Sequence, residues 1–280
     1  MPDRYHVFVV TGAGPGSLGE ATAAALREHG RVITTRRSGP ASDDFHPLDL
    51  ADAGSVRAFA DWLGEATDRL DVLVNNAGVH LDLRGRWREP QLVDGHEIHW
   101  RTNYLGTAHL TRLLLPALER TAAMAGEARV VNVVSKLHTR GRNRWLDGIV
   151  TPYDSWDAYG TSKLALVHEA AEIDRRYGGQ GLHGYSLHPG SVYTKVADRG
   201  LETAPGLARL RKLLAPLERR ALASPEHGAR TAVFCATSPE AVPGGYHRRS
   251  APAEPSSEVA DPEAARALWD RTTALVDALR

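Results

Sequence analysis

Short apolar runs alternate with amphipathic segments along most of the chain. Runs rich in apolar and β-branched residues predict buried strands at 7–10, 31–35, 71–74, 129–134 and 182–187. Between these runs, apolar residues recur at helical spacing and predict helices at 20–29, 52–67, 96–120 and 156–177. Strands that alternate with helices pair in parallel, because each crossover helix returns the chain to the same edge of the sheet.

This order predicts an α/β, Rossmann-like doubly wound parallel sheet of about seven strands, with helices on both faces. We expect one domain over residues 1–280, in which residues 1–194 form the core that carries the site. Residues 195–223 are basic and amphipathic, and predict either helices that cover a substrate cleft or a plain surface pair.

The end of the chain predicts a few further elements. We expect a helix over 224–236, a last short strand at 244–246, and a tail at 247–280 that holds a Pro-, Ser- and Ala-rich linker and a terminal helix. One face of that helix, over 261–279, is formed by Ala265, Leu268, Trp269, Thr272, Leu275 and Leu279.

Composition narrows the class of protein. Apolar residues make up 42% of the 280 residues, and Lys plus Arg balance Asp plus Glu at 34 each, so no nucleic-acid or anionic-membrane partner is indicated. A single cysteine, Cys235, excludes an internal disulfide and fits a reducing compartment. With neither a signal peptide nor a long apolar run, we expect a cytoplasmic protein; the scattered histidines predict no metal site.

A glycine-rich loop separates the first strand from the first helix. Residues 11–19 read Thr-Gly-Ala-Gly-Pro-Gly-Ser-Leu-Gly. Glycines let a backbone approach a pyrophosphate, and the following helix offers free N–H groups, so the loop predicts a dinucleotide site; an ordinary glycine turn is the alternative. The contacts would come from Gly12, Gly14, Gly16, Ser17, Leu18 and Gly19.

The second strand ends in Arg36-Arg37, where a dinucleotide fold meets the adenosine ribose. Arginine there suits the 2′-phosphate of NADP, whereas a carboxylate suits the 2′-hydroxyl of NAD. Residues 31–40 contain no acidic residue, so NADP(H) is favoured over NAD(H). Two solvated arginines are the alternative interpretation.

Tyr159 and Lys163 are four residues apart in a predicted helix and share one face. A cation beside a phenol lowers its pKa, so such a pair can exchange protons; a solvated surface pair has the same spacing. A lone serine after a strand, such as Ser135, is usually a cap or turn residue. The pair gains weight from the motifs that precede it.

Taken together, the motifs resemble the short-chain dehydrogenase/reductase family over nearly the whole chain. Thr11-Gly12-x-x-x-Gly16 resembles its cofactor loop, although Gly19 lies one residue further on than usual, and Asn75-Asn76-Ala77-Gly78 matches its third-strand motif. The loop may be aligned instead as Gly14-x-Gly16-x-x-Gly19. The resemblance implies a catalytic tetrad of Asn103, Ser135, Tyr159 and Lys163. It also implies cofactor contacts from Asp49, Leu50, Asn76, Ala77, Gly78, Tyr159, Lys163, Pro189, Gly190, Val192 and Thr194.

The retinol-dehydrogenase-like branch resembles the chain most, through residues 103–106, residues 152–159 and the Trp269 helix. The resemblance implies hydride transfer between a nicotinamide and a small or medium carbonyl or alcohol substrate. Tyr159 would be the general acid/base, with Lys163 lowering its pKa, Ser135 holding the substrate oxygen and Asn103 holding a water.

Other expectations accompany this resemblance. A homo-oligomer, dimer or tetramer, is implied through the helices that carry Asn103 and Tyr159. A redox-neutral enzyme, a non-catalytic cofactor sensor and a partner-dependent subunit remain alternatives.

Overall fold

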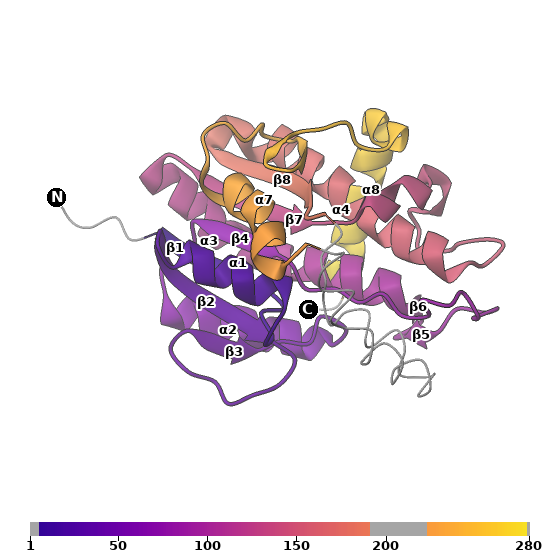
Figure 1. Cartoon of the computed structure of the whole chain (residues 1–280), viewed down its shortest axis with the longest axis horizontal. Coiled ribbons are helices and arrows are strands. Elements are labelled where there is room, and N and C mark those ends of the chain that lie inside the picture. Colours follow the sequence, from indigo (N-terminus) through magenta and orange to yellow (C-terminus); the bar gives the residue numbers. More distant parts are fainter. Residues whose placement is uncertain (1–5, 191–222, 279–280) are drawn as a thin grey trace.

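A mixed, mainly parallel sheet forms the centre of the molecule (Figure 1). The structure is a computed structural model that describes residues 6–190 and 223–278. Its eight-stranded sheet has the order β10-β9-β8-β7-β4-β1-β2-β3. The strands are β1 His6–Val10, β2 Gly30–Arg36, β3 Phe45–Pro47, β4 Val72–Asn75, β7 Ala128–Val133, β8 Leu182–His188, β9 Tyr246–Arg248 and β10 Ala251–Pro252. All neighbouring pairs are parallel except β9 and β10.

Helices cover both faces of the sheet, as the alternation of strands and helices predicts. The helices are α1 Leu18–Leu26, α2 Ala53–Ala66, α3 Gly106–Ala125, α4 Ser155–Tyr177, α7 Pro225–Thr237 and α8 Pro262–Asp277. Strand β1 illustrates why. Val7 and Val9 pack in the core cluster that contains α2 and α3, whereas Phe8 and Val10 pack in the cluster that contains α1 and α7. Successive side chains of a strand point to opposite faces, so an apolar run of this kind requires cover on both.

The sheet has one strand more than the seven expected, at its β10 edge. After β9, Arg249 and Ser250 both adopt positive φ angles of 55° and reverse the chain, so Ala251–Pro252 pairs antiparallel with β9. This strand lies in the Pro-, Ser- and Ala-rich segment that the sequence suggests is a linker. Proline is tolerated there because an edge strand has one side without a partner.

The helix expected at 96–120 begins later and ends later than predicted. Asp94 and Gly95 adopt positive φ angles and form the turn of a small hairpin, β5 Leu92–Val93 with β6 His96–Glu97. The π-helical segment η1, Trp100–Leu105, follows and continues directly into α3. The Glu97 carboxylate accepts hydrogen bonds from the backbone N–H groups of His99 (2.8 Å) and Trp100 (2.9 Å), which ends the hairpin and starts the helix.

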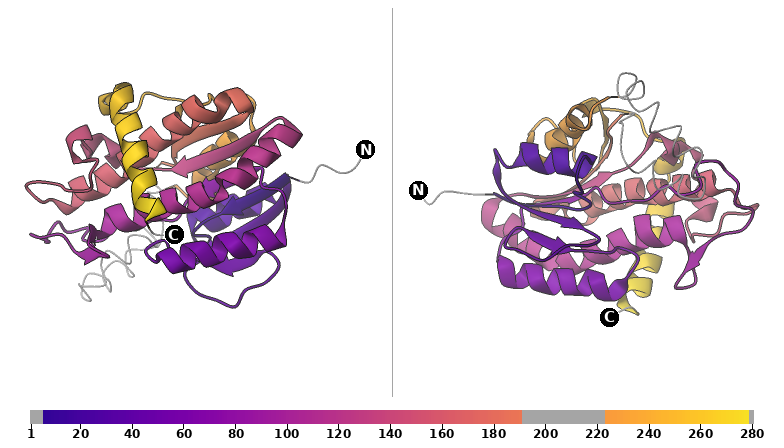
Figure 2. Two further views of the ribbon diagram at one scale, coloured as in Figure 1. Left: turned by 180° about the vertical axis from the view of Figure 1, so that it is seen from behind. Right: turned by 60° about the horizontal axis from the view of Figure 1, so that its bottom comes forward.

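The terminal helix α8 lies across α3 and α4 (Figure 2). Its buried face contains Ala265, Leu268, Trp269 and Thr272, as predicted, together with Val276. Leu275 is half-buried, and Leu279 lies outside the described residues. The Arg112 guanidinium stacks on the Trp269 ring at 3.3 Å, and the Tyr104 and Thr272 hydroxyls are 2.8 Å apart. The chain therefore covers part of its α3–α4 surface with its own helix.

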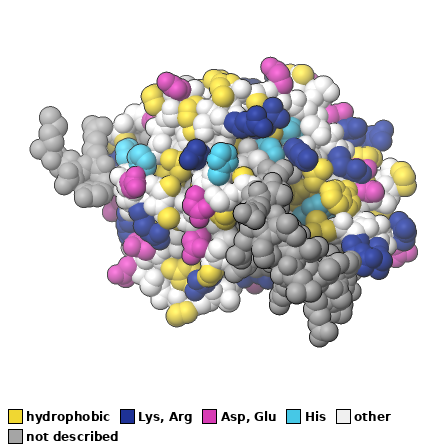
Figure 3. Space-filling view, in the orientation of Figure 1, with side chains coloured by type: hydrophobic (Ala, Val, Ile, Leu, Met, Phe, Trp, Pro, Cys, Tyr) yellow, Lys and Arg dark blue, Asp and Glu magenta, His cyan; other side chains and the backbone are white. Residues whose placement is uncertain are grey.

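Four further expectations concern membrane-spanning helices, metal sites, the balance of charge and the helices that cover a cleft. Within residues 6–190 and 223–278, no helix has the length and apolar character needed to cross a bilayer. The same described residues contain no cluster of His, Cys, Asp or Glu that could hold a metal ion. Basic and acidic side chains both occur over the face drawn in Figure 3. The helices expected to cover a cleft at 195–223 lie, except for residue 223, outside the described residues.

Candidate active site

A cavity of about 440 Å³ lies at the carboxyl ends of β1, β2, β4, β7 and β8. Parallel α/β sheets bind ligands at this edge. The structure brings most of the sequence-predicted site residues into its wall: Gly12, Gly14, Ser17, Leu18, Arg36, Arg37, Asp49, Leu50, Asn76, Ala77, Gly78, Ser135, Tyr159, Lys163, Pro189 and Gly190. Gly16, Gly19 and Asn103 do not line it, and Val192 and Thr194 lie outside the described residues.

The glycines of the loop after β1 differ in what requires them. Gly12 has a φ of 72° and lies so close to Ala77 that a Cβ would meet the Ala77 Cα at 2.8 Å. A Cβ on Gly19 would meet the Asn76 Nδ2 at 2.5 Å, so this glycine allows the start of α1 to pack on the third-strand motif. Gly14 lines the cavity with nothing within 4 Å of an added Cβ. Gly12 is therefore required by a tight turn and Gly19 by close packing, whereas Gly14 leaves the backbone open to a ligand in the cavity.

Helix α1 begins at this loop with an N-terminal cap. The Ser17 hydroxyl accepts a hydrogen bond from the Glu20 N–H at 3.1 Å, and the Glu20 carboxylate reaches back to the Gly16 N–H at 2.6 Å. The N–H groups of Leu18 and Gly19, at the first helical positions, have no intrahelical partner. They and the positive end of the helix suit an anionic group in the cavity.

The third-strand motif ties the loop to the rest of the sheet. The Thr11 hydroxyl accepts hydrogen bonds from the N–H groups of Asn76 (3.0 Å) and Ala77 (2.9 Å). The buried amide of Asn75 donates to the Asn132 side chain at 2.9 Å. These contacts hold the ends of β1, β4 and β7 in one arrangement.

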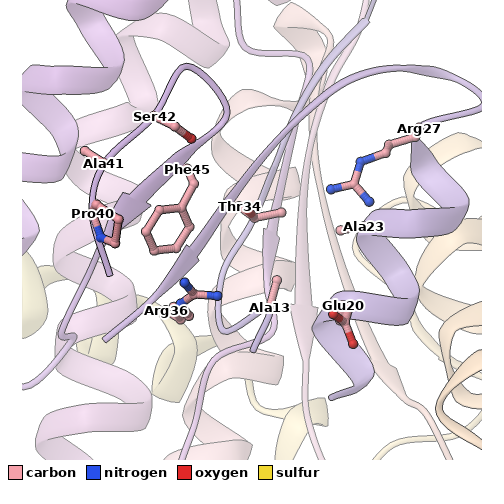
Figure 4. A pocket seen from close by; sticks show the side chains of 10 residues that line it. All are labelled: Ala13, Glu20, Ala23, Arg27, Thr34, Arg36, Pro40, Ala41, Ser42 and Phe45. Carbon is pink, nitrogen blue, oxygen red and sulfur yellow. The ribbon is translucent and has the colours of Figure 1, made fainter. Parts of the chain in front are cut away.

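Two arginines stand at the end of β2. Arg36 Nε donates to the Ser38 carbonyl at 2.8 Å, and its guanidinium lies 4.6 Å from the Phe45 ring centroid. Arg37 is exposed and also lines the main cavity. Figure 4 shows a second cavity of about 440 Å³ beside β2, which shares Arg36 with the first and which Arg27 borders from α1. The second cavity is lined by two arginines, Arg27 and Arg36, and by one acidic residue, Glu20, whose carboxylate accepts from the Gly16 N–H.

Tyr159, Lys163 and Ser135 meet in the main cavity. Tyr159 and Lys163 lie one turn apart on α4, and Ser135 follows β7, where it caps the short 3₁₀ segment η2, Lys136–Arg140. Ser135 and Tyr159 both line the cavity, and the Ser135 hydroxyl acts to lower the pKa of the phenol. Lys163 Nζ donates to the Val133 carbonyl at 3.1 Å.

Burial sets the protonation of this group. Burial raises the pKa of Tyr159 to about 12, an effect that the Ser135 hydroxyl opposes, and lowers the pKa of Lys163 to about 8. The sequence suggests that Lys163 lowers the pKa of Tyr159, but no influence of Lys163 on the phenol is resolved in this structure. At neutral pH Tyr159 is therefore a protonated phenol that can donate.

Asn103 lies behind the cavity wall in η1 and is fully buried. Its Oδ1 accepts from the Val79 N–H at 2.7 Å, and its Nδ2 donates to the Val79 carbonyl at 2.9 Å and to Ser162 Oγ at 3.1 Å. The side chain thus joins η1 to the third-strand motif and to α4. These protein contacts use both hydrogens of Nδ2 and one of the two lone pairs of Oδ1, and the water expected at Asn103 stays a prediction.

The sequence reasoning missed two histidines at the site. The imidazole of His80 stacks on the Tyr159 ring with centroids 4.0 Å apart and planes 12° apart, and His188 lines the cavity. Burial lowers the pKa of His80 to about 3, so it is neutral at physiological pH. His80 directly follows Val79, next to the third-strand motif, which is the signal that could have drawn attention to it.

The residues present fit a nicotinamide dinucleotide. The cavity joins the arginines of β2, the glycine loop and the start of α1 to Tyr159 and Lys163, so phosphate-binding and proton-donating groups line one continuous wall. Arg36 or Arg37 would hold the adenosine end, Leu18 and Gly19 the pyrophosphate, and Lys163 the ribose beside the nicotinamide.

Comparison with known proteins agrees with this geometry. Residues 6–204 match the family model described as short chain dehydrogenase. The chain is 36% identical to the polyprenol dehydrogenase of Mus musculus, covering 96% of this chain and 83% of that protein. It is 32% identical to human retinol dehydrogenase 13, with the same two coverages.

Solved structures show the same fold. An uncharacterised protein of Mycobacterium paratuberculosis superposes with a TM-score of 0.71 at 30% identity, covering 97% of this chain and 93% of that one. The NADP complex of Pseudomonas aeruginosa RhlG superposes with a TM-score of 0.64 at 26% identity, covering 86% of this chain and 93% of that one. The chain therefore belongs to the short-chain dehydrogenase/reductase family of oxidoreductases, whose fold binds nicotinamide cofactors, and its relatives include the retinol-dehydrogenase-like branch.

Proposed function

We propose that the protein is an NADP(H)-dependent oxidoreductase that transfers hydride between the nicotinamide and the carbonyl or alcohol group of a small or medium organic substrate. The observation that carries the proposal is the Tyr159 phenol, which lines the cavity beside Ser135 and lies one helical turn from Lys163. A phenol with a pKa of about 12 holds its proton at neutral pH and can donate it to a carbonyl oxygen during reduction.

Each residue has a distinct role in this reaction. Tyr159 donates its hydroxyl proton to the substrate oxygen, and Ser135 donates a hydrogen bond that stabilises negative charge on the same oxygen. Lys163 is anchored by the Val133 carbonyl and keeps further N–H groups for the ribose. Asn103 positions η1 against Val79 and α4. The bound nicotinamide supplies the hydride.

Arginine chemistry supports NADP(H) over NAD(H). The Arg36 guanidinium is held by the Ser38 carbonyl and the Phe45 ring, so its plane is already oriented when a phosphate arrives. Arg37 adds a second positive charge in the same wall. Replacing Arg36 and Arg37 by alanine should weaken NADPH binding roughly ten- to a hundredfold and leave NADH binding within about threefold, because only NADPH carries the 2′-phosphate.

The substrate is proposed to be an apolar aldehyde, ketone or alcohol. The cavity that contains Tyr159 also presents Val79, Val133, Val134 and Pro189. Relatives named for polyprenol and retinol support an extended hydrocarbon attached to the reacting carbon. Cytoplasmic location and homo-oligomeric assembly stay predictions from the sequence.

The test is Tyr159→Phe, which removes one hydroxyl and keeps the ring that stacks on His80. NADPH oxidation is followed with all-trans-retinal and a panel of simple ketones, and NADPH binding by nicotinamide fluorescence. We expect turnover to fall at least a hundredfold while the Kd for NADPH stays within about threefold. Unchanged turnover would refute the role of Tyr159.

The same assay separates the alternatives. Substrate consumption without net NADPH oxidation would indicate a redox-neutral reaction. Tight NADPH binding with no conversion of any compound would favour a cofactor sensor or a subunit that needs a partner.

A further inference from the structure

The segment that precedes α8 packs against the loop that carries Ser135. It consists of residues 256–260, of which Ser257–Ala260 forms the 3₁₀ segment η5. Although it follows Ser135 by more than a hundred residues, it is held there by polar contacts at two points, His138 and Asn143. We call residues 256–260 the tail segment.

His138 makes the first contact and bridges the tail segment to Ser135. Its side chain is 2% exposed. Nε2 lies 3.0 Å from the Ser256 backbone nitrogen, which can only donate, so Nε2 must accept. The proton of the neutral ring is then on Nδ1, which donates to the Ser135 carbonyl at 2.7 Å.

Ser135 is held by His138 twice. Its carbonyl accepts both the Nδ1–H of the ring and the His138 backbone N–H, at 3.0 Å. These two bonds fix the peptide plane that follows Ser135, and with it the position of the Ser135 side chain, whose hydroxyl also accepts from the Leu137 N–H at 3.2 Å. A change at the ring of His138 therefore acts on the Ser135 hydroxyl, and Ser135 lines the cavity together with Tyr159.

Asn143 makes the second contact. Its backbone N–H donates to the Glu258 carboxylate at 2.6 Å, and its Nδ2 donates to the Glu258 carbonyl at 2.8 Å. Asn143 Oδ1 lies 2.9 Å from Nε2 of His168, a fully buried residue of α4. Polar contacts therefore join the tail segment to both ends of the loop between Ser135 and Trp145.

We propose that His138 is a positioning residue, and that the tail segment sets the orientation of Ser135 through it. The proposal rests on the proposed function only for the hydroxyl of Ser135; the link between the tail segment and the loop stands on the contacts alone. The tail segment itself does not line the cavity, so its effect is expected on turnover and not on cofactor binding.

Ser256→Pro is the sharpest perturbation. Ser256 has a φ of −57°, which proline adopts, so the change removes the N–H that His138 accepts and places a ring carbon there. Ser256→Ala is the reference, because it removes the same hydroxyl and keeps the N–H. In hydrogen–deuterium exchange, residues 135–141 should exchange roughly tenfold faster in S256P than in S256A, while α4 is unchanged. Equal exchange in the two variants would overturn the link.

Two substitutions of His138 test the same link in case the S256P variant does not fold. In H138N the amide nitrogen takes the place of Nδ1 and keeps the donor to Ser135, but the acceptor for Ser256 is lost. In H138Q the amide oxygen takes the place of Nε2, so Ser256 keeps its acceptor and Ser135 loses its donor. Because His138 links Ser256 to Ser135, kcat with NADPH and all-trans-retinal should fall roughly five- to tenfold in both variants, with the Kd for NADPH unchanged.

A positioning role also predicts non-additivity. In the Ser135→Ala background, H138Q should lower kcat no further, since the group that it positions is already absent. An additive effect, or wild-type kcat in both His138 variants, would refute the inference. Wild-type turnover in S135A alone would instead refute the proposed role of Ser135, while the exchange experiment would still decide whether the tail segment holds the loop.

Discussion

Buried neutral histidines should make the protein sensitive to mild acid. His80 is 7% exposed and His168 is fully buried, and burial lowers their pKa values to about 3 and about 4. In the unfolded chain both titrate near 6.5. The stability that they contribute is therefore complete above pH 6.5 and is lost as the pH falls towards the folded-state values, because only the unfolded chain then takes up protons.

The size of the effect follows from linkage. Around pH 5 the unfolded state binds about two more protons than the folded state at these sites, so the free energy of unfolding falls by about 2.7 kcal/mol per pH unit. From pH 6.5 to pH 4 the two histidines together cost about 5.5 kcal/mol, which is of the order of the whole stability of a typical domain. Protonation of the buried Glu169, whose pKa burial raises, works in the opposite direction.

The assay is urea unfolding, followed by tryptophan fluorescence at several pH values and constant ionic strength. His168→Gln is the matched variant, because its amide can still donate to Asn143 but cannot titrate. We expect the dependence of unfolding free energy on pH in this variant to be shallower by about 1.4 kcal/mol per pH unit near pH 5. Identical pH dependence in the variant and the wild type would refute the reasoning.

Three other predictions concern the core, the glycine loop and the reaction. Glu169→Leu leaves the buried Arg112 guanidinium, 2.7 Å from Glu169, without its partner and should cost about 3–5 kcal/mol in urea unfolding, whereas adding Arg112→Leu should restore at least half of that loss. Gly19→Ala places a Cβ 2.5 Å from the Asn76 amide nitrogen and should weaken NADPH binding at least tenfold, measured by fluorescence titration. An unchanged Kd would show that the loop relaxes around the added methyl group and would contradict this prediction. Because the pKa of the Tyr159 phenol is about 12, the phenolate fraction and with it the initial rate of alcohol oxidation should rise about tenfold per pH unit between pH 6 and 9, and a flat profile would contradict its role as base.

The position of α8 limits which surfaces of α3 and α4 the predicted homo-oligomer could use. The helices expected to pair two subunits are α3 and α4, and α8 lies across them with Trp269 stacked on Arg112. A homo-oligomer would have to use the part of α3 and α4 that α8 leaves free, or another surface.

Much of the architecture could be predicted from local pattern. The parallel strands follow from continuous apolar runs such as Val7 to Val10, which need cover on both faces. The extra strand β10 could not, because its two residues acquire strand geometry only through the turn at Arg249 and Ser250 and the neighbouring β9. Likewise the helix that carries Asn103 starts late because the Asp94-Gly95 turn first commits the chain to a hairpin.

The order of chemistry-bearing residues was determined by the sequence itself. The glycine loop, Arg36-Arg37, Asn75 to Gly78, Ser135 and the Tyr159–Lys163 pair all follow strands or begin helices, and parallel strands bring such positions to one edge. Only the tertiary structure decided the rest. Burial, which depends on every neighbour, raises the pKa of the Tyr159 phenol to about 12. The contacts of His80 with Tyr159 and of Ser256 with His138 have no local signature, because residues 79 or 118 positions apart meet only when the sheet has formed.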